Sequence, residues 1–326
     1  KFWKMTEDVE DEKYAKVAKQ TQRNSQFLIL LSVGILLTLF GFLGLPPSSS
    51  GQQASLRQAN DANSDSNNGN PPPTTINVIS TRTIQELEQD VVEWDAKVRA
   101  IKERVDIFET DEEGQAAAQK LQEATRQLLH RRYGIHEPYR VVMTLEFQDT
   151  IPDFNIHGKD GSFTIELAPS SLQPHSIYTF LELCRHWKGG AFHRIASHVL
   201  QAMVHTRDIR HLAFQEYSPA YPHRQGTVGY AGRPSGPAFY VSIQDNTRNH
   251  GPGSQQQHNP HEADSCFGTV VEGFDDKNVL RISKVPGTGF LGDARKHVRI
   301  PHVEIQIPNP ENLSEYIPWK EIETSD

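Results

Sequence analysis

The sequence of 326 residues predicts a mainly β fold for the second half of the chain, with helical segments before it. Short β-type runs recur there between turns and polar loops. Regular alternation of strands and helices, which a doubly wound sheet requires, is absent. This pattern suits a closed antiparallel eight-stranded β-barrel capped by helices. A transmembrane helix and a coiled-coil or helical-hairpin segment are expected to precede the barrel.

The predicted barrel spans residues 139–307 and contains one amphipathic helix, Pro174–Arg185. Apolar side chains of this helix recur on one stripe, and Pro174 occupies a first-turn position, where its missing N–H costs nothing. The predicted strands are Arg140–Phe147, Ser162–Leu167, Ala191–Ile195, Val199–His205, Thr227–Ala231, Ala238–Ile243, Cys266–Glu272 and His302–Gln306. Residues 308–326 are predicted to form a C-terminal tail.

A long apolar segment near the start of the chain predicts a membrane anchor. Phe27–Leu45 contains neither a charged residue nor a Pro. At about 1.5 Å per residue, a helix of this length nearly spans the hydrocarbon core of ~30 Å. The alternative is a cleaved signal peptide, but the segment exceeds the usual apolar region of about 7–15 residues. Its end, Gly44–Pro47, also lacks a small-residue cleavage pattern. Residues 27–45 are therefore predicted to be a transmembrane signal anchor.

The distribution of basic residues predicts the orientation of this anchor. Arg57 is the only basic residue between the span and Ser80. By the positive-inside rule, residues 1–26 form a cytosolic tail, and the barrel lies in the lumen of the endomembrane system or outside the cell. The sequon at Asn312 would be a glycosylation site in that compartment of the secretory pathway. The basic residues before the span are Lys1, Lys4, Lys13, Lys16, Lys19 and Arg23.

Two segments of contrasting composition connect the anchor to the barrel. Residues 46–77 are rich in Ser, Gln, Asn, Gly and Pro, which predicts a disordered linker. Residues 78–133 are predicted to form a helical stalk, and Thr83 with Glu86 predicts a capping box at its start. The apolar residues then recur at alternating spacings of three and four, as heptad positions do. They are Ile84, Leu87, Val91, Trp94, Val98, Ile101, Val105 and Phe108.

Three arrangements of the stalk are consistent with this pattern. Residues 84–108 could form a parallel homodimeric coiled coil of four heptads. The segment could instead fold back as a hairpin, with a turn at Asp111–Gly114, or one helix could pack on the barrel. The apolar residues of the returning helix would be Ala117, Leu121, Ala124 and Leu128.

Four motifs in the predicted barrel follow an order known from one enzyme family. They are Lys188–Ile195, which reads Lys-Gly-Gly-Ala-Phe-His-Arg-Ile; the helical segment Ser171–Cys184; the aromatic pair Phe239 and Tyr240; and Cys266–Val270, which contains Phe-Gly. In this order they resemble the cyclophilin-type peptidyl-prolyl cis-trans isomerases over roughly residues 139–307, about half of the chain. The resemblance implies the barrel fold, an isomerase activity in protein folding, proline-containing polypeptides as partners, and no cofactor.

The resemblance also implies a set of site residues. Arg194 takes the position of the catalytic arginine, whose guanidinium favours the twisted amide by hydrogen-bonding the prolyl nitrogen. The implied substrate-binding residues are Phe192, Val199, Leu200, Gln201, Ala202, Ala231, Phe239, Tyr240 and Asp264.

Several of these positions depart from the family pattern. Val199 and Leu200 stand where the family has Phe-Met, and Gln201 comes one residue before the family's Gln, where Ala202 now lies. The rim changes as well: Asn259 and Pro260 replace Trp-Leu, Asp264 replaces a His, Gly232 replaces an Asn, and Tyr240 adds a hydroxyl to the pocket floor. We therefore expect weak isomerase activity. The alternative is a catalytically inactive interaction module presented on the stalk.

Composition excludes other classes of function. The formal net charge of −8 argues against nucleic acid as a partner. The two cysteines, Cys184 and Cys266, do not form a disulfide framework and are predicted to be buried free thiols. The chain contains 15 His, but no pair has a recognised ligand spacing, so no metal site is predicted.

Overall fold

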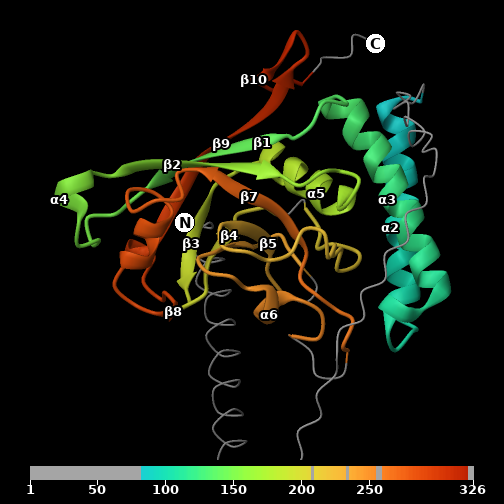
Figure 1. Cartoon of the computed structure of the whole chain (residues 1–326), viewed down its shortest axis with the longest axis horizontal. Helices are drawn as coiled ribbons and strands as arrows, with labels where there is room; N and C mark the ends of the chain where they lie inside the picture. The colour runs from blue at the N-terminus through green and yellow to red at the C-terminus, as the bar shows by residue number, and fades with distance from the viewer. Residues whose placement is uncertain (1–81, 207–208, 233–234, 255–258, 322–326) are drawn as a thin grey trace, which may run out of the picture. The chain divides into compact units, whose positions relative to one another are not determined.

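A computed structural model describes residues 82–206, 209–232, 235–254 and 259–321 of the chain (Figure 1). The predicted cytosolic tail, the membrane span Phe27–Leu45 and the linker lie outside these residues. Among the residues that are described, no helix has the length and apolar character to cross a membrane.

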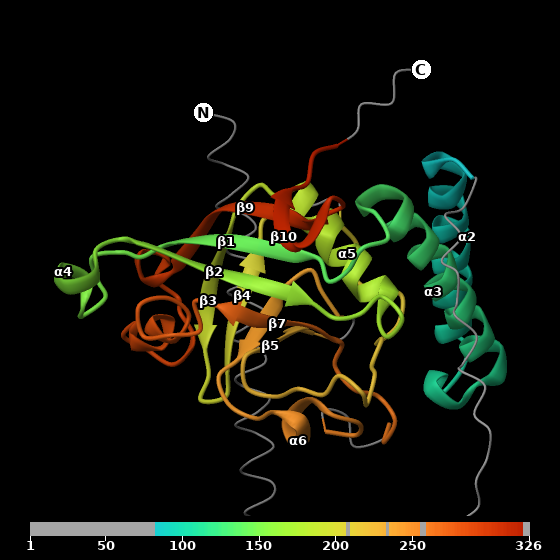
Figure 2. The same ribbon diagram turned by 45° about the horizontal axis from the view of Figure 1, so that its top comes forward.

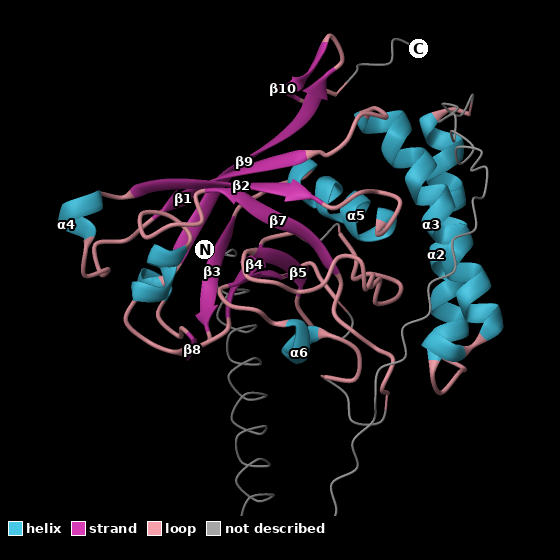
Figure 3. Cartoon of the chain, in the orientation of Figure 1, coloured by secondary structure: helices cyan, strands magenta, loops and turns pink. Residues whose placement is uncertain are grey.

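The core of the fold is a closed antiparallel β-barrel (Figure 3). The strands are β1 (Arg140–Glu146), β2 (Asp160–Leu167), β3 (Gly190–Ile195), β4 (Val199–Val204), β5 (Thr227–Tyr230), β6 (Phe239–Ser242), β7 (Cys266–Glu272), β8 (Gly289–Phe290), β9 (Val298–Asn309) and β10 (Asn312–Pro318). They are ordered β10-β9-β1-β2-β7-β5-β6-β4-β3-β8, and β9 also pairs with β3. The eight strands from β9 to β3 therefore close into a ring, with β8 and β10 as extensions. The predicted closed eight-stranded barrel is confirmed.

Strand alternation accounts for the core. In β1 the side chains of Val141, Met143 and Leu145 are buried, whereas the residues between them are partly exposed. This period of two is what a sheet with one buried face requires. Inside the barrel, aromatic rings fill the space: the Phe163 and Phe192 ring centroids are 6.2 Å apart, and Phe192 meets Phe239 at the same distance.

Helix α5 (Pro174–Arg185) covers the barrel as predicted, with Pro174 in its first turn. Its Phe180 ring lies 4.6 Å from Phe267 and 5.6 Å from Phe239, measured between centroids. The start of α5 is held by the buried carboxylate of Glu216, which accepts hydrogen bonds from the backbone N–H groups of His175 and Ser176. These N–H groups have no partner within the helix, so the carboxylate satisfies them.

The predicted stalk is a helical hairpin of α2 (Ile84–Lys102) and α3 (Glu112–Tyr133). The capping box of Thr83 and Glu86 is present. Asp111 caps α3 by accepting a hydrogen bond from the backbone of Gly114, at the predicted turn. The two helices pack along each other, with Val98 and Leu121 fully buried. Of the three arrangements, the structure shows the hairpin.

The prediction of four continuous heptads is wrong. Helix α2 ends at Lys102, so Val105 and Phe108 do not continue its apolar stripe. Phe108 instead lies in a short 3-10 turn and packs against Phe214, with ring centroids 6.0 Å apart. It also fills the space beside Gly114, where a Cβ atom would come within 2.8 Å of its ring. This packing inside the chain uses an aromatic side chain that the heptad pattern assigned to a partner helix.

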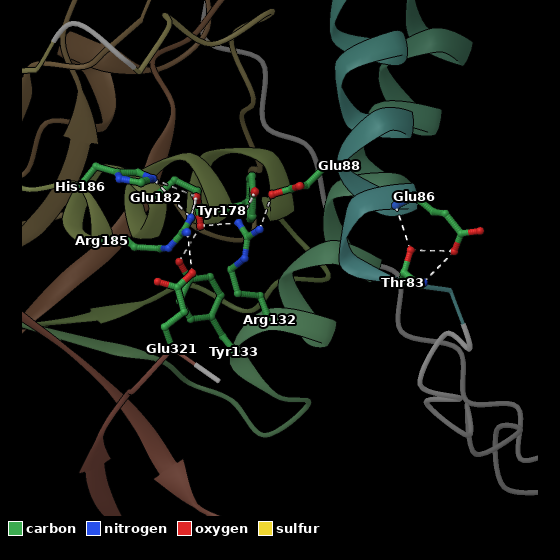
Figure 4. Close-up of polar contacts among 10 residues, drawn as sticks. All are labelled: Thr83, Glu86, Glu88, Arg132, Tyr133, Tyr178, Glu182, Arg185, His186 and Glu321. Carbon is green, nitrogen blue, oxygen red and sulfur yellow. Dashed lines mark hydrogen bonds and ion pairs between the residues drawn. The ribbon is translucent and has the colours of Figure 1, made fainter. Parts of the chain in front are cut away.

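A buried arginine joins the hairpin to α5 (Figure 4). Arg132 of α3 contacts Glu182 and Tyr178 of α5, each at 2.7 Å, and Glu88 of α2 at 2.5 Å. The phenol of Tyr133 donates to the same Glu182 carboxylate at 2.7 Å. Because Arg132, Tyr133 and Glu182 are buried, removing one of them leaves the others without a partner, so this network holds the hairpin against α5. Both views show α5 between the sheet and α3 (Figures 1 and 2).

The predicted C-terminal tail at residues 308–326 is corrected by the structure. Strand β9 runs through Asn309, and β10 returns antiparallel beside it. Beyond β10, the Trp319 ring lies 4.9 Å from Tyr133, and its indole N–H donates to the carbonyl of Arg132. The sequence did not predict β10, because this strand is exposed along most of its length and so lacks the alternation of buried and exposed residues that marks a strand.

The two cysteines are free, as predicted. Cys184 lies on α5 and Cys266 on β7, and both side chains are buried. Burial raises the pKa of the Cys266 thiol to about 12, because the thiolate would lose its hydration. Both thiols are therefore protonated and act as small apolar core groups.

The hairpin seam yields a prediction on stability. Leu121 of α3 is completely buried, in a cluster with residues of α2 and with Phe108. We expect Leu121→Ala to reduce the free energy of unfolding by about 2–5 kcal/mol in urea denaturation, because it removes apolar contacts and leaves a cavity. Val92 on α2 is 61% exposed, so Val92→Ala is the matched control and should change stability by less than about 0.5 kcal/mol. Equal effects of the two variants would contradict the hairpin packing.

A second prediction concerns the acid stability of the hairpin interface. The ring of His175 stacks on Phe214, and burial lowers its pKa to about 4. The unfolded state, with a pKa near 6.5, then binds more protons than the folded state between these values, so stability falls as the pH falls from about 6.5 to about 4. Urea denaturation across this range should show that the free energy of unfolding falls more steeply with falling pH in wild type than in His175→Phe, by up to about 1.4 kcal/mol per pH unit. Parallel pH profiles would show that His175 is not held neutral.

Candidate functional site

A bulge in β3 brings Arg194 out of the barrel core. Phe192 pairs with Ala202 of β4, but Arg194 pairs with Gln201, so the register shifts between these two residues of β3. Strict alternation would have put Phe192 and Arg194 on the same face of the strand. The extra residue lets Phe192 stay buried while His193 and Arg194 are both partly exposed. The bulge therefore makes the predicted catalytic side chain available at the surface.

Arg194 belongs to a row of residues that are direct cross-strand partners. Across β8, β3, β4, β6 and β5 the row is Phe290, Arg194, Gln201, Tyr240 and Gly229. Direct partners point to the same face of a sheet, so these residues share the outer surface of the barrel. We refer to them as the Arg194 row.

Gln201 orients the arginine. The Nη1 group of Arg194 donates a hydrogen bond of 2.8 Å to Oε1 of Gln201. On its other side, the guanidinium carbon lies 5.2 Å from the Phe290 ring centroid, which is a cation–π distance. Both contacts restrict the side chain and leave further N–H donors of the guanidinium for a ligand. The role of Gln201 is thus to hold Arg194, a role that the sequence did not reveal.

Four of the predicted substrate-binding residues lie on the wrong face of the barrel. Phe192, Leu200, Ala202 and Phe239 are buried in the hydrophobic core. A bound peptide cannot contact them without opening the barrel, so their assignment to the pocket is wrong. The physical reason is the alternation of side chains along a strand. Leu200, Ala202 and Phe239 are each next to a residue that faces outward, and the bulge separates Phe192 from the outward-facing Arg194.

The remaining predicted residues are on or near the outer surface. Val199 is buried but does not belong to the cluster of residues that forms the hydrophobic core. Ala231 is partly exposed just after β5, and its backbone N–H donates to the carbonyl of Ala238. Asn312 is exposed on β10, where its side chain accepts hydrogen bonds from Ser314. Its glycosylation stays a prediction.

Tyr240 is enclosed by a polar cluster. Its hydroxyl lies 3.3 Å from Oδ2 of Asp264 and 3.3 Å from Nδ1 of His223, so the phenol has the partners that its burial requires. The ring of His250, which ends the short helix α6 (Thr247–His250), stacks on Tyr240 with 4.6 Å between centroids. Gly229 makes room on the sheet, since a Cβ atom there would come within 2.7 Å of the Tyr240 hydroxyl.

The cluster contains histidines that the sequence analysis did not assign to the site. His250 Nδ1 contacts Oδ2 of Asp264 at 2.5 Å, and His223 Nε2 contacts the carbonyl of Asp264 at 2.9 Å. The pKa of the neighbouring His198 is lowered, first by burial and then by His250 and Arg194. Within the described part of the chain, no group of three or more His, Cys, Asp or Glu side chains could hold a metal ion.

Two further residues were missed for different reasons. His250 lies in a polar, Gly- and Pro-containing segment that the sequence marks as a surface loop, and its burial depends on α6 folding back over β6. Phe290 is a single aromatic residue in a two-residue strand, which is too short to give a sequence pattern.

A cavity of about 560 Å³ lies elsewhere in the domain, between α2, α5 and residues 209–211, and none of the predicted site residues lines it.

Comparison with known protein families gives information on the family of this domain. Residues 153–305 match the family model described as cyclophilin type peptidyl-prolyl cis-trans isomerase/CLD. The chain contains a cyclophilin-type domain. Its match covers every member of the Arg194 row, together with Asp264 and His250. A search of curated proteins found no match to the chain.

The matched range begins after β1, although β1 is part of the closed barrel of the cyclophilin-type domain. Strand β1 pairs with both β2 and β9, and Val141 faces Ile165 on one side and Ile305 on the other. The folded domain therefore starts before residue 153.

Proposed function

We propose that the cyclophilin-type domain binds X-Pro segments of polypeptides and isomerises them weakly through Arg194. The observation that supports this most directly is the bulge in β3, which exposes Arg194 while Gln201 holds its guanidinium. The X-Pro amide resists rotation by about 18–20 kcal/mol because resonance keeps it planar. A guanidinium that hydrogen-bonds the prolyl nitrogen stabilises the twisted amide more than either planar form, which lowers this barrier.

Weak turnover follows from the surroundings of Arg194. Tyr240 is covered by His250, and Leu200 and Ala202 face the core, so little apolar wall surrounds a bound proline. Apolar contact contributes roughly 25 cal/mol per Å² of area removed from water, and this contribution is reduced here. Poor orientation of the ligand reduces the rate further.

Arg194→Ala should test the catalytic role. We expect kcat/KM for a proline tetrapeptide, measured by a protease-coupled assay, to fall by about 10²–10³-fold or to the uncatalysed rate, because a transition-state donor is lost. Arg126 on α3 has a side chain that is 40% exposed and lies outside the site, so Arg126→Ala serves as a control that should retain wild-type activity. Undiminished activity in Arg194→Ala would exclude this mechanism.

A second candidate function is an interaction module without catalysis. The enclosure of Tyr240 by His250, Asp264 and His223 favours it, because the pocket floor expected for an isomerase is not accessible. The same assay separates the two functions. If wild type and Arg194→Ala are equally inert while wild type still binds the peptide, the module is the better description.

We also propose that Phe27–Leu45 anchors the chain in a membrane and that the domain lies on the luminal or extracellular side. The support is the uncharged span and the excess of basic residues before it. The sequon at Asn312 is consistent with this side, because its side chain is exposed on β10.

Protease protection should test this topology. In sealed vesicles from expressing cells, added protease should leave the barrel intact, and detergent should make it accessible, because the membrane separates the two sides. A glycan removed by the substitution Asn312→Gln would agree with this orientation. Digestion of the barrel in sealed vesicles would reverse it.

A further inference from the structure

The aromatic residues around Arg194 differ sharply in accessibility. Phe192, Phe239 and Tyr240 are each at most 2% exposed, whereas Phe290 is 68% exposed. A ligand can contact only the last of these rings without a rearrangement. Single exposed apolar residues are common on protein surfaces, so exposure alone does not define a binding residue. What distinguishes Phe290 from other exposed apolar residues is its position next to Arg194.

Tyr240 is covered by a ring that is fixed at both its backbone and its side chain. The His250 N–H donates to the carbonyl of Asn246, and the His250 carbonyl accepts from the N–H of Asp264. The His250 imidazole is tied to the Asp264 carboxylate and lies on Tyr240 with an interplanar angle of 28°. A five-membered imidazole is close in size to the pyrrolidine ring of proline. His250 thus already occupies the surface of Tyr240 that a proline would use.

Phe290 lies next to Arg194 in the row, whereas Tyr240 is two strands away. Arg194 is the direct partner of Phe290 across β3 and β8, and β4 separates Arg194 from Tyr240. Because neighbouring strands are about 4.8 Å apart, Tyr240 starts roughly 10 Å from Arg194 at the backbone. The Phe290 strand is also anchored, since the N–H of Leu291 donates to the carbonyl of His193. The exposed ring and the guanidinium therefore form one continuous surface.

We infer that Phe290, and not Tyr240, is the aromatic surface on which this domain holds the proline ring of an X-Pro segment. The inference rests on the proposed function, because it names a specificity-determining residue of the same site. Aromatic surfaces are a recurrent means of binding proline-rich segments, whose rings are rigid and apolar. A proline on Phe290 lies beside Arg194, so Phe290 supplies the apolar contact and Arg194 supplies the hydrogen bond.

The test measures binding of two peptides to the full chain by calorimetric titration. The probes are acetyl-Ala-Ala-Pro-Ala-amide and its counterpart with Ala in place of Pro. We expect wild type to prefer the proline peptide, and Phe290→Ala to lose at least tenfold in affinity for it. Phe290→Tyr should retain binding, because it keeps the aromatic face. The melting temperature of Phe290→Ala should be unchanged, since the ring is exposed.

Two further variants serve as controls. Ile156 on α4 (Phe154–His157) is 77% exposed, so Ile156→Ala removes a comparable exposed apolar group away from the site and should bind as wild type does. His250→Ala uncovers Tyr240 and should leave the affinity within about twofold, because Tyr240 is not the contact surface.

The outcomes separate the inference from the proposed function. Wild-type binding that is unaffected by Phe290→Ala overturns the inference and leaves the proposed function standing. If wild type does not bind the proline peptide in preference to its counterpart, the proposed function fails, and the inference fails with it.

Discussion

The pairing of β9 with both β1 and β3 is the constraint on which the rest of this structure depends. Closure gives every strand an inner and an outer face, and the inner face is filled by side chains such as Phe163 and Phe192. Since successive residues alternate between the faces, closure also decides which side chains can reach a ligand. Function in this domain is therefore limited to the outer face and to the loops.

The bulge in β3 is a local exception to this alternation. One extra residue separates the buried Phe192 from the accessible Arg194, although regular alternation would place both on the same side. Bulges recur next to active sites because they redirect a side chain without breaking the sheet. The hydrogen bond from Arg194 to Gln201 then fixes the redirected side chain. Through this arrangement the Arg194 guanidinium reaches the outer surface while the barrel core stays packed.

The aromatic rings around this arginine differ in accessibility. Helix α6 folds over β6, so that the His250 ring covers Tyr240, while Phe290 on β8 presents an accessible ring on the opposite side of Arg194. The helical hairpin contributes in a different way. Its buried Arg132 joins Glu88 and Glu182, which binds the hairpin to α5.

The sequence by itself determined the eight barrel strands, α5, the capping box at Thr83 and the buried cysteines, because these depend on local periodicity, capping and composition. It also predicted Arg194 as the catalytic residue, which stays a prediction. It could not determine which neighbours of Arg194 face outward, where α2 ends, or that residues after Asn309 form β10. Those features depend on contacts that the local sequence pattern does not show: the bulge opposite β4, Phe108 against Phe214, β10 beside β9, and His250 over Tyr240. Only the closed tertiary structure brings these groups together, and so only it decides which predicted site residues are available to a ligand.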